Sequence, residues 1–227
     1  GYTTRIFSQR IGASFSPKIQ GDFWLRFADN EMTFIGEASN SYLLMPNAHF
    51  TFALKDNFTL HTKLGYTEWF AETSSEHNRL LRPEIWGVIK ANDKHHLTFG
   101  VDYAQHTFTR SKVLEESQGN TGIFVQDNFL LSDKITIDGA IRVDLPDNID
   151  PVFSPKLSLL ISPTGNIDLR AGASRGFHAP TPQDLYEEGY GHGGTARRFG
   201  NPDLKPEYST SLWFDATYKP TENLWFN

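Results

Sequence analysis

A regular alternation of apolar and polar residues is the feature that most constrains how this chain can fold. In residues 135–144, the odd positions hold Ile, Ile, Gly, Ile and Val, and the even positions hold Thr, Asp, Ala, Arg and Asp. Similar alternation occurs in residues 58–67, 96–103 and 212–219. Successive side chains of a β-strand point to opposite faces, so a period of two predicts strands with one apolar and one polar face.

About twelve segments of the chain read as strands. Several of them reach ten or more residues, whereas strands of soluble sheets have about five or six and tilted membrane-spanning strands about nine to eleven. Their length therefore favours strands that cross a bilayer. The predicted strands lie near residues 4–15, 19–29, 48–55, 58–70, 83–91, 95–107, 120–131, 135–144, 153–162, 167–175, 209–219 and from 224 onward.

The predicted connections alternate between short turns and long loops. Short turns lie near 16–18, 56–57, 92–94, 132–134, 163–166 and 220–223, and long loops near 30–47, 71–82, 108–119, 145–152 and 176–208. Membrane barrels have short periplasmic turns and longer outer loops. We therefore predict an all-β protein, an antiparallel up-and-down transmembrane β-barrel. Residues 32–35 could form an extra short strand or pack as loop.

Composition removes several other classes of protein. The formal net charge is −6, which gives no basic footprint for nucleic acid. The chain has no cysteine, so it has no disulfides or thiolate metal sites. No apolar run approaches the roughly 20 residues of a spanning helix. A soluble β-sandwich or β-solenoid remains an alternative, because its strands would also alternate.

The two ends of the sequence suggest an internal piece of a longer protein. Gly1 is not an initiator methionine, and residues 223–227 read as a strand interrupted in its course. We find no domain boundary within residues 1–227, which we expect to be barrel throughout.

Residues 174–207 and 123–137, in the second half of the chain, contain motifs that resemble those of the TonB-dependent outer-membrane receptors. The family has a Ser-Arg-x-Phe-x-Ala-Pro box at a strand end, then Leu-Tyr or Leu-Phe, then a Gly-Asn-Pro-Asp-Leu-Lys-Pro-Glu box. The residues 123–129 and 131–137 are similar to the family's Val-Gln-Asp strand and its turn. The Ser-Arg box, the Leu-Tyr pair and the Gly-Asn-Pro box are matched here by Ser174, Arg175, Phe177, Ala179, Pro180, Leu185, Tyr186, Gly200, Asn201, Pro202, Asp203, Leu204, Lys205, Pro206 and Glu207.

The resemblance implies a fold, a location and partners. Such receptors have a barrel of about 22 strands around an N-terminal plug, so this chain would supply about twelve strands and no plug. It implies the bacterial outer membrane, a small metal-chelate ligand, contact with outer-membrane lipid, and energy supplied by the TonB complex acting on the missing plug. The expected cargo is a ferric siderophore or cobalamin.

Proline and a helix start shape the loop between the two boxes. Prolines cannot donate ladder hydrogen bonds, so they force the chain out of the sheet; here these are Pro180, Pro182, Pro202 and Pro206. Thr181 is predicted to cap a short helix, with Asp184 near its positive end. We expect this helical turn to run through Glu188 and to end at Gly189.

We expect most motif residues to support the loop and not to select a cargo, because boxes common to receptors of different cargoes cannot distinguish among them. This scaffold group comprises Arg175, Phe177, Ala179, Pro180, Asn201, Pro202, Leu204, Pro206 and Glu207.

The candidate ligand contacts lie between the boxes and comprise Tyr186, Tyr190, His192, Arg197 and Arg198. His192 is either a haem-iron ligand, as histidines of this interval are in haem-binding members of the family, or an exposed loop histidine. Its Gly-His-Gly-Gly context favours the second, since it offers no side chains to orient a ligand. Arg197 and Arg198 could pair with anionic groups of a siderophore or with propionates, or could be solvated or in contact with lipopolysaccharide.

No residue pattern points to catalysis, a firm metal site or a bound cofactor. Glu115-Glu116, Glu187-Glu188 and His95-His96 are adjacent pairs, whose side chains diverge in a strand. We therefore expect a receptor and transporter, not an enzyme. The alternatives are a haem receptor using His192, a passive porin-like barrel, and a soluble β-domain.

Overall fold

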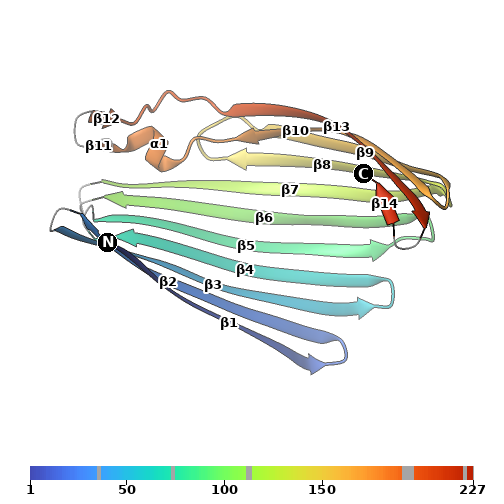
Figure 1. Ribbon diagram of the computed structural model, residues 1–227, viewed down its shortest axis with the longest axis horizontal. Coiled ribbons are helices and arrows are strands. Elements are labelled where there is room, and N and C mark those ends of the chain that lie inside the picture. The colour runs from blue at the N-terminus through green and yellow to red at the C-terminus, as the bar shows by residue number, and fades with distance from the viewer. Residues whose placement is uncertain (35–36, 73–74, 111–113, 191–196, 222–223, 227) are drawn as a thin grey trace.

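The computed structural model describes the chain except for residues 35–36, 73–74, 111–113, 191–196, 222–223 and 227. Twelve strands form one antiparallel sheet in the order of the sequence, from β1 to β10 and then β13 and β14. Each strand pairs with the next strand of this sheet along the chain, with β10 followed by β13, so the sheet is an up-and-down meander (Figure 1). The predicted fold class and the predicted number of strands in the sheet are confirmed.

The elements have the following bounds. The main sheet consists of β1 (Tyr2–Ser16), β2 (Ile19–Phe34), β3 (Glu37–Lys55), β4 (Phe58–Ala71), β5 (Glu76–Lys90), β6 (His95–Arg110), β7 (Leu114–Ser132), β8 (Ile135–Pro146), β9 (Val152–Thr164), β10 (Ile167–His178), β13 (Glu207–Thr221) and β14 (Leu224–Phe226). Between β10 and β13 lie α1 (Pro182–Tyr186), β11 (Glu188–Tyr190) and β12 (Arg197–Phe199).

The two ends of the sheet differ. One end, the turn rim, carries the tight connections at residues 17–18, 56–57, 91–94, 133–134 and 165–166. The opposite end, the loop rim, carries α1, β11 and β12, on the left in Figure 1. No helix in the described part of the chain has the length and hydropathy needed to cross a bilayer.

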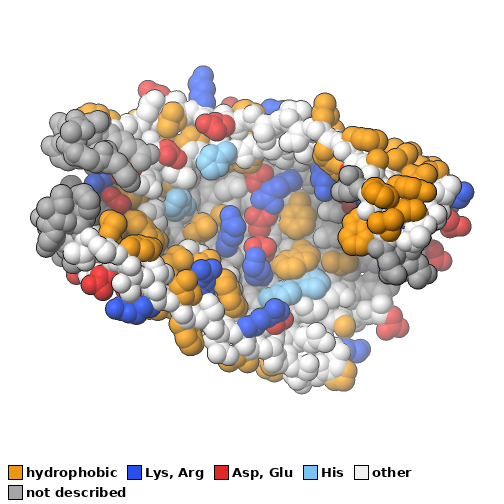
Figure 2. Space-filling model, viewed as in Figure 1, with side chains coloured by type: hydrophobic (Ala, Val, Ile, Leu, Met, Phe, Trp, Pro, Cys, Tyr) orange, Lys and Arg blue, Asp and Glu red, His pale blue; other side chains and the backbone are white. Residues whose placement is uncertain are grey.

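The two faces of the sheet differ as the alternation predicts. Large apolar side chains stand exposed on the outward face, among them Leu157 at 58% and Phe214 at 71% exposure. The other face is hollowed, and Lys, Arg, Asp, Glu and His side chains gather along its floor (Figure 2). Such a sheet is stable where lipid covers the first face and water or protein the second.

The predicted extent of three long loops is wrong, because strands occupy most of the residues in each of them. β2 and β3 extend through residues 30–47, β4 and β5 through most of 71–82, and β6 and β7 through most of 108–119. The ladder continues there, as in the pair Asn30↔Ser41. Where a hairpin extends beyond the part of the sheet that lipid covers, both of its faces meet water. Its sequence then loses the apolar–polar alternation, although its backbone hydrogen bonds continue. Residues 32–34 belong to β2 and form no separate strand.

Two prolines lie near the points where the sequence predicts the starts of β3 and β5, later in the chain than the starts that the structure shows. Pro46 and Pro83 lie near the predicted starts of strands at 48 and 83 and lack the N–H that a ladder needs. In the structure the pairing of β3 with β4 passes from Leu44↔Glu68 to Asn47↔Gly65 with the register unchanged. The strand therefore runs through Pro46 with a local gap in its ladder.

The outermost strands of the sheet affect how soluble the isolated chain is. Within the described residues, β1 pairs only with β2 and β14 only with β13, so two edges present unpaired backbone groups beside an exposed apolar face. We predict that residues 1–227 produced alone aggregate in detergent-free buffer, as measured by sedimentation. A monodisperse species with a cooperative urea transition would contradict this expectation.

Candidate functional site

A row of polar positions crosses the inner face of the sheet. Cross-strand pairing aligns one residue from each of the strands β2 to β8, and residues directly opposite in an antiparallel pair share a face. These positions span 122 residues of sequence, so strand register alone brings them together. The polar row consists of Asp22, His49, Lys63, Glu84, Asp102, Gly122 and Asp144.

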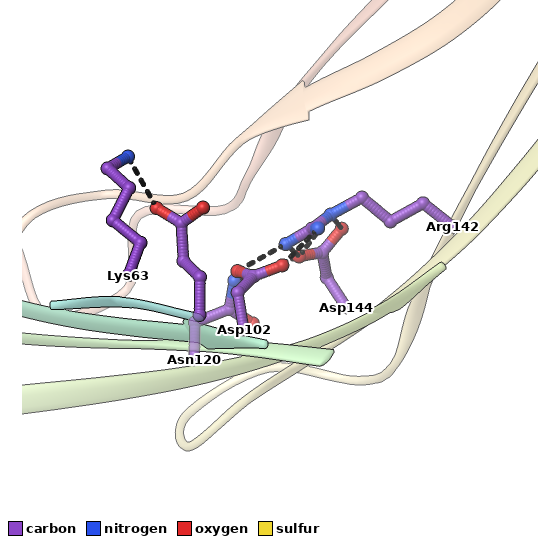
Figure 3. Close-up of polar contacts among 6 residues, drawn as sticks. Lys63, Asp102, Asn120, Arg142 and Asp144 are labelled. Carbon is purple, nitrogen blue, oxygen red and sulfur yellow. Dashed lines mark hydrogen bonds and ion pairs between the residues drawn. The ribbon is translucent and has the colours of Figure 1, made fainter. Parts of the chain in front are cut away.

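Charges in and beside the polar row neutralise one another. Lys63 Nζ donates to Glu84 Oε1 at 2.9 Å (Figure 3). At the other end, Arg10 Nε donates to Asp22 Oδ1 at 3.0 Å. Paired charges attract a passing ion less than bare ones, so these stretches of wall are polar without being strong ion traps.

Arg142 is the centre of the most connected network on this wall. Its Nη2 donates to Asp102 Oδ1 at 2.9 Å and to Asp144 Oδ1 at 2.8 Å (Figure 3). Asn120 Nδ2 donates to the same Asp144 oxygen at 2.9 Å. Asp144 is only 3% exposed, and a buried carboxylate is costly without a cation. Arg142 therefore neutralises and orients the two aspartates.

A glycine makes room for this guanidinium. A Cβ at Gly122 would lie 1.9 Å from Arg142 Nη2. Gly122 also lies between Asp102 and Asp144 in the polar row. The missing side chain lets the guanidinium lie over the β7 backbone and reach both carboxylates.

A chamber of about 490 Å³ opens beside this network, beneath the segment that leads from β10 into α1. Arg82, His106, Gln118, Asn120 and Arg142 line its wall. The side chain of Arg82 is exposed and forms no hydrogen bond or ion pair with any residue that the structure describes. Arg82 is thus a cation available to an anionic ligand in the chamber.

An aromatic cluster lies on the same inner wall, on β3, β4 and β5. The rings of His49, His61 and Trp86 are within 14° of parallel, and His61 and Trp86 have centroids 4.9 Å apart. His49 Nε2 lies 3.3 Å from His61 Nδ1, the distance of a hydrogen bond. In the described chain, no group of three or more His, Cys, Asp or Glu side chains is arranged to hold a metal ion.

The helix α1 is held by its own sequence and by the wall behind it. Thr181 Oγ1 accepts from the Asp184 backbone N–H at 3.2 Å, and Asp184 Oδ2 accepts from the Thr181 N–H at 3.0 Å, which forms a capping box. Pro182 and Leu185 are buried, and α1 packs on β6 and β7. The predicted cap is confirmed, but the helix ends at Tyr186, not at Gly189, because β11 begins at Glu188.

The second motif packs directly against this helix. The Gly200 N–H donates to the Glu187 carbonyl at 2.6 Å, and the Asn201 N–H donates to the Asp184 carbonyl at 3.0 Å. A Cβ at Gly200 would lie 2.5 Å from the Leu185 carbonyl group. Only glycine permits this approach, so the second motif and helix α1 form a single folded unit.

An ion pair ties this unit to the neighbouring hairpin of β5 and β6. Arg110 Nη1 lies 2.9 Å from Glu187 Oε1 and 3.4 Å from Glu76 Oε1. Both glutamates are buried, each with 8% of the residue exposed. The contact joins residues 77 positions apart and holds the α1 unit over the inner wall.

The predicted ligand contacts have the following places. Tyr186 is the half-buried last residue of α1. The antiparallel pair of β11 and β12 sets Tyr190 opposite Arg197 and Gly189 opposite Arg198. The structure thus brings Tyr190, Arg197 and Arg198 to one small hairpin at the loop rim. His192 lies outside the described residues.

The predicted scaffold residues divide between the two ends of the loop. Arg175 and Phe177 are in β10, and Glu207 begins β13. Phe177, Ala179 and Pro180 line the chamber. Asn201 Oδ1 accepts from the Asp203 N–H at 3.0 Å and so closes a turn. The remaining members, Pro202, Leu204 and Pro206, line an open hollow of about 790 Å³ with residues 147–150.

Sequence reasoning did not find Arg82, His106 or Arg142 as site residues. Each is an isolated polar residue on an alternating strand, which is the ordinary pattern of an inward face. The sequence did offer one indication of this site, namely polar residues close to Gly100 and Gly122. A glycine within a strand often marks a place where another group approaches the backbone closely.

Comparison with known proteins identifies the kind of barrel. A family model described as TonB dependent receptor-like, β-barrel matches residues 2–226. The chain is 27% identical over 142 residues to the iron-regulated outer membrane virulence protein of Vibrio cholerae, which covers 58% of this chain and 21% of that protein. It is 30% identical over 101 residues to the vitamin B12 transporter BtuB of Photobacterium profundum, which covers 44% of this chain and 15% of that protein.

Solved structures share the fold. The siderophore receptor PirA from Pseudomonas aeruginosa superposes with a TM-score of 0.80 at 17% identity, over 97% of this chain and 44% of that one. A variant of the ferric enterobactin receptor PfeA from the same organism gives 0.82 at 14% identity, over 99% and 41%. The chain therefore spans less than half the length of these relatives.

Gly122 provides a test of the Arg142 network. We predict that Gly122→Ala displaces the guanidinium and lowers the free energy of unfolding by about 1–3 kcal/mol, the cost of leaving a buried polar group poorly paired. Urea unfolding of the full-length protein in detergent measures this change. Gly139→Ala is the matched control, because a Cβ there meets only Leu157 Cδ1 at 4.0 Å. Equal stability of the two variants would refute the role of Gly122.

Gly200 provides a test of the α1 unit. We predict that Gly200→Ala separates the second motif from the helix and accelerates hydrogen exchange at the Gly200 and Asn201 amides by at least about tenfold, equivalent to ~1.4 kcal/mol of local stability. Gly165→Ala is the control, since a Cβ there has no atom within 4 Å. Unchanged protection in Gly200→Ala would show that the packing is not required.

Proposed function

Since this chain belongs to the family of TonB dependent receptor-like β-barrels, proteins of the bacterial outer membrane, we propose that it forms part of a receptor that takes up a scarce metal chelate. The cargo class is a ferric siderophore or cobalamin. The named relatives support this proposal, since they include an iron-regulated outer membrane protein and a vitamin B12 transporter. Residues 1–227 would all be barrel.

The observation that carries the proposal is the chamber beneath the segment that leads from β10 into α1. It combines Arg82, a cation that has no partner among the residues that the structure describes, with neutral donors and acceptors from Gln118 and Asn120. Arg142 also faces the chamber, but Asp102 and Asp144 already neutralise it. An exposed guanidinium binds carboxylate, phenolate or phosphate oxygens through paired N–H groups. The chamber is therefore suited to an anionic group of a chelate.

The rest of the inner wall is suited to passage. Its ion pairs are internal, as with Lys63 and Glu84, so they provide hydrogen-bonding surface with little net charge. A ligand leaving Arg82 would meet a polar wall that binds it weakly. Weak sites along a path allow release, whereas strong ones would stop the ligand.

The loop rim would make the first contact with the cargo. Tyr186, Tyr190, Arg197 and Arg198 lie in or beside the small hairpin after α1, and the hairpin is fastened to the wall by Arg110. Aromatic and guanidinium groups together suit a chelate that has both ring and anionic parts. By family resemblance, release would use the TonB complex acting on a plug. No bond would be made or broken.

Three alternative functions make different predictions. A haem receptor would need His192 as an axial ligand, and a passive porin-like barrel would show no saturable binding. Neither has an observation among the described residues in its favour. A soluble β-domain would need its exposed apolar face covered in water.

Cargo binding by the full-length receptor in detergent tests the proposal. The ligands are several ferric siderophores, cobalamin and haem, and the variant is Arg82→Gln. We predict saturable binding of a siderophore or cobalamin, and for an anionic cargo a loss of affinity of about ten- to a hundredfold in Arg82→Gln, since a charge-assisted hydrogen bond contributes ~1.5–3 kcal/mol.

Two further variants make the result specific. Lys55→Gln removes a charge at the turn rim and should leave affinity unchanged. His192→Ala should matter only for haem. Haem binding lost in His192→Ala, or an absence of saturable binding to any ligand, would overturn the proposed function.

A further inference from the structure

A groove on the outward face has no part in the proposed passage. It crosses β7 to β10 and reaches β13, with a volume of about 630 Å³. Ile141, Phe153 and Leu157 form its apolar walls, each at least 47% exposed. A cavity of this size falls within the usual range for small-molecule sites. We call it the lipid-facing groove.

Small residues form the floor of the groove. Gly139 pairs with Asp127 on β7 and with Leu157 on β9, and Ala173 lies beyond Leu157 on β10. A Cβ at Gly139 would meet only Leu157 Cδ1 at 4.0 Å, so the space above Gly139 is open. Bulkier residues on either side leave a channel between them.

A cation stands at the loop-rim side of the groove. Arg175 lines it, and its guanidinium carbon lies 4.8 Å from the centroid of the Tyr208 ring. This stacking uses the face of the guanidinium and leaves its N–H groups, which lie in the plane, able to donate. Among the described residues, Arg175 has no hydrogen bond or ion pair.

The position of Arg175 along its strand suits a lipid headgroup. Arg175 follows Ile167, the first residue of β10, by eight positions. At ~3.3 Å per residue and a tilt of about 40°, that is roughly 20 Å above the turn rim, near the border of an apolar band about 25 Å tall. Tyr208 beside it is 54% exposed, as expected of an aromatic residue at that border.

The far side of the groove does not present a bare charge. Asp127 lines it there, and its Oδ2 lies 2.6 Å from His95 Nδ1. The His95 ring also stacks on Phe129, with centroids 4.5 Å apart. The pairing reduces the cost of holding a carboxylate on a lipid-facing surface.

From these features we propose that the lipid-facing groove binds one anionic membrane lipid, with an acyl chain over Gly139 and a phosphate on Arg175. The groove supplies apolar area below the border of the membrane, and Arg175 is an available cation at that border. Lys156 also borders the groove, but it pairs with Ala140 and Ser174, which belong to the inward-facing set of the alternation. A second protein chain would need to bury much more surface than the groove offers. The site depends on the chain lying in the outer membrane and is independent of the cargo.

Native mass spectrometry of the full-length receptor tests the site. The probes are phosphatidylglycerol and phosphatidylcholine with the same acyl chains, added to delipidated protein. We predict that phosphatidylglycerol is retained about fivefold more, the ratio that corresponds to ~1 kcal/mol per basic residue near an anionic surface. Arg175→Gln should remove this preference, and Gly139→Leu should reduce the retention of both lipids by filling the groove.

Ala171→Leu is the matched control for the filled groove. Ala171 is on the outward face, paired with Leu159 and Phe214, and lies outside the groove lining. It should retain lipid as the unaltered receptor does. Equal retention in Gly139→Leu would overturn the proposal, as would a receptor dimer that Gly139→Leu dissociates, since a second copy would then be the occupant. Cargo binding should be unchanged in Gly139→Leu, so this test is separate from that of the chamber.

Discussion

Backbone hydrogen bonding is the constraint on which the rest of this structure depends. A strand that enters a bilayer has no water to satisfy its N–H and C=O groups, so each group needs a partner on a neighbouring strand. The ladder from β1 to β14 supplies these partners. It tolerates the missing donor of Pro46 because the register is the same on both sides of the gap. The ladder extends into the loop-rim hairpins, beyond the segments that the alternation identifies.

The ladder also determines where the polar chemistry lies. Register aligns one residue of each strand from β2 to β8 on the inner face, and this alignment creates pairs such as Lys63 with Glu84. Within this wall Arg142 holds two aspartates, whereas Arg82 faces the chamber and has no partner in the described part of the chain. Under the proposed function, the contrast between neutralised and available cations would give the wall a binding position beside a surface suited to passage.

The loop that carries the family motifs is built as a rigid unit. Helix α1 is capped by Thr181, and the second motif joins it through a close approach at Gly200. Arg110 then fastens the unit to another hairpin through a pair of nearly buried carboxylates. The second motif is thus held against helix α1 by the hydrogen bonds of the Gly200 and Asn201 N–H groups. On the outward face, by contrast, the apolar surface is not flat. It contains the groove over Gly139, which we propose as the site of one lipid.

The sequence by itself determined the all-β class, the twelve-strand meander, the assignment of faces and the cap at Thr181, because each depends on local periodicity or on adjacent residues. It did not determine the ends of the longest hairpins, since strands that leave the membrane lose their alternation while their ladder continues. The Arg142 network, the chamber around Arg82 and the groove at Gly139 were decided only by the tertiary structure. Each joins strands far apart in sequence, and a shift of register by one residue would turn every side chain to the other face.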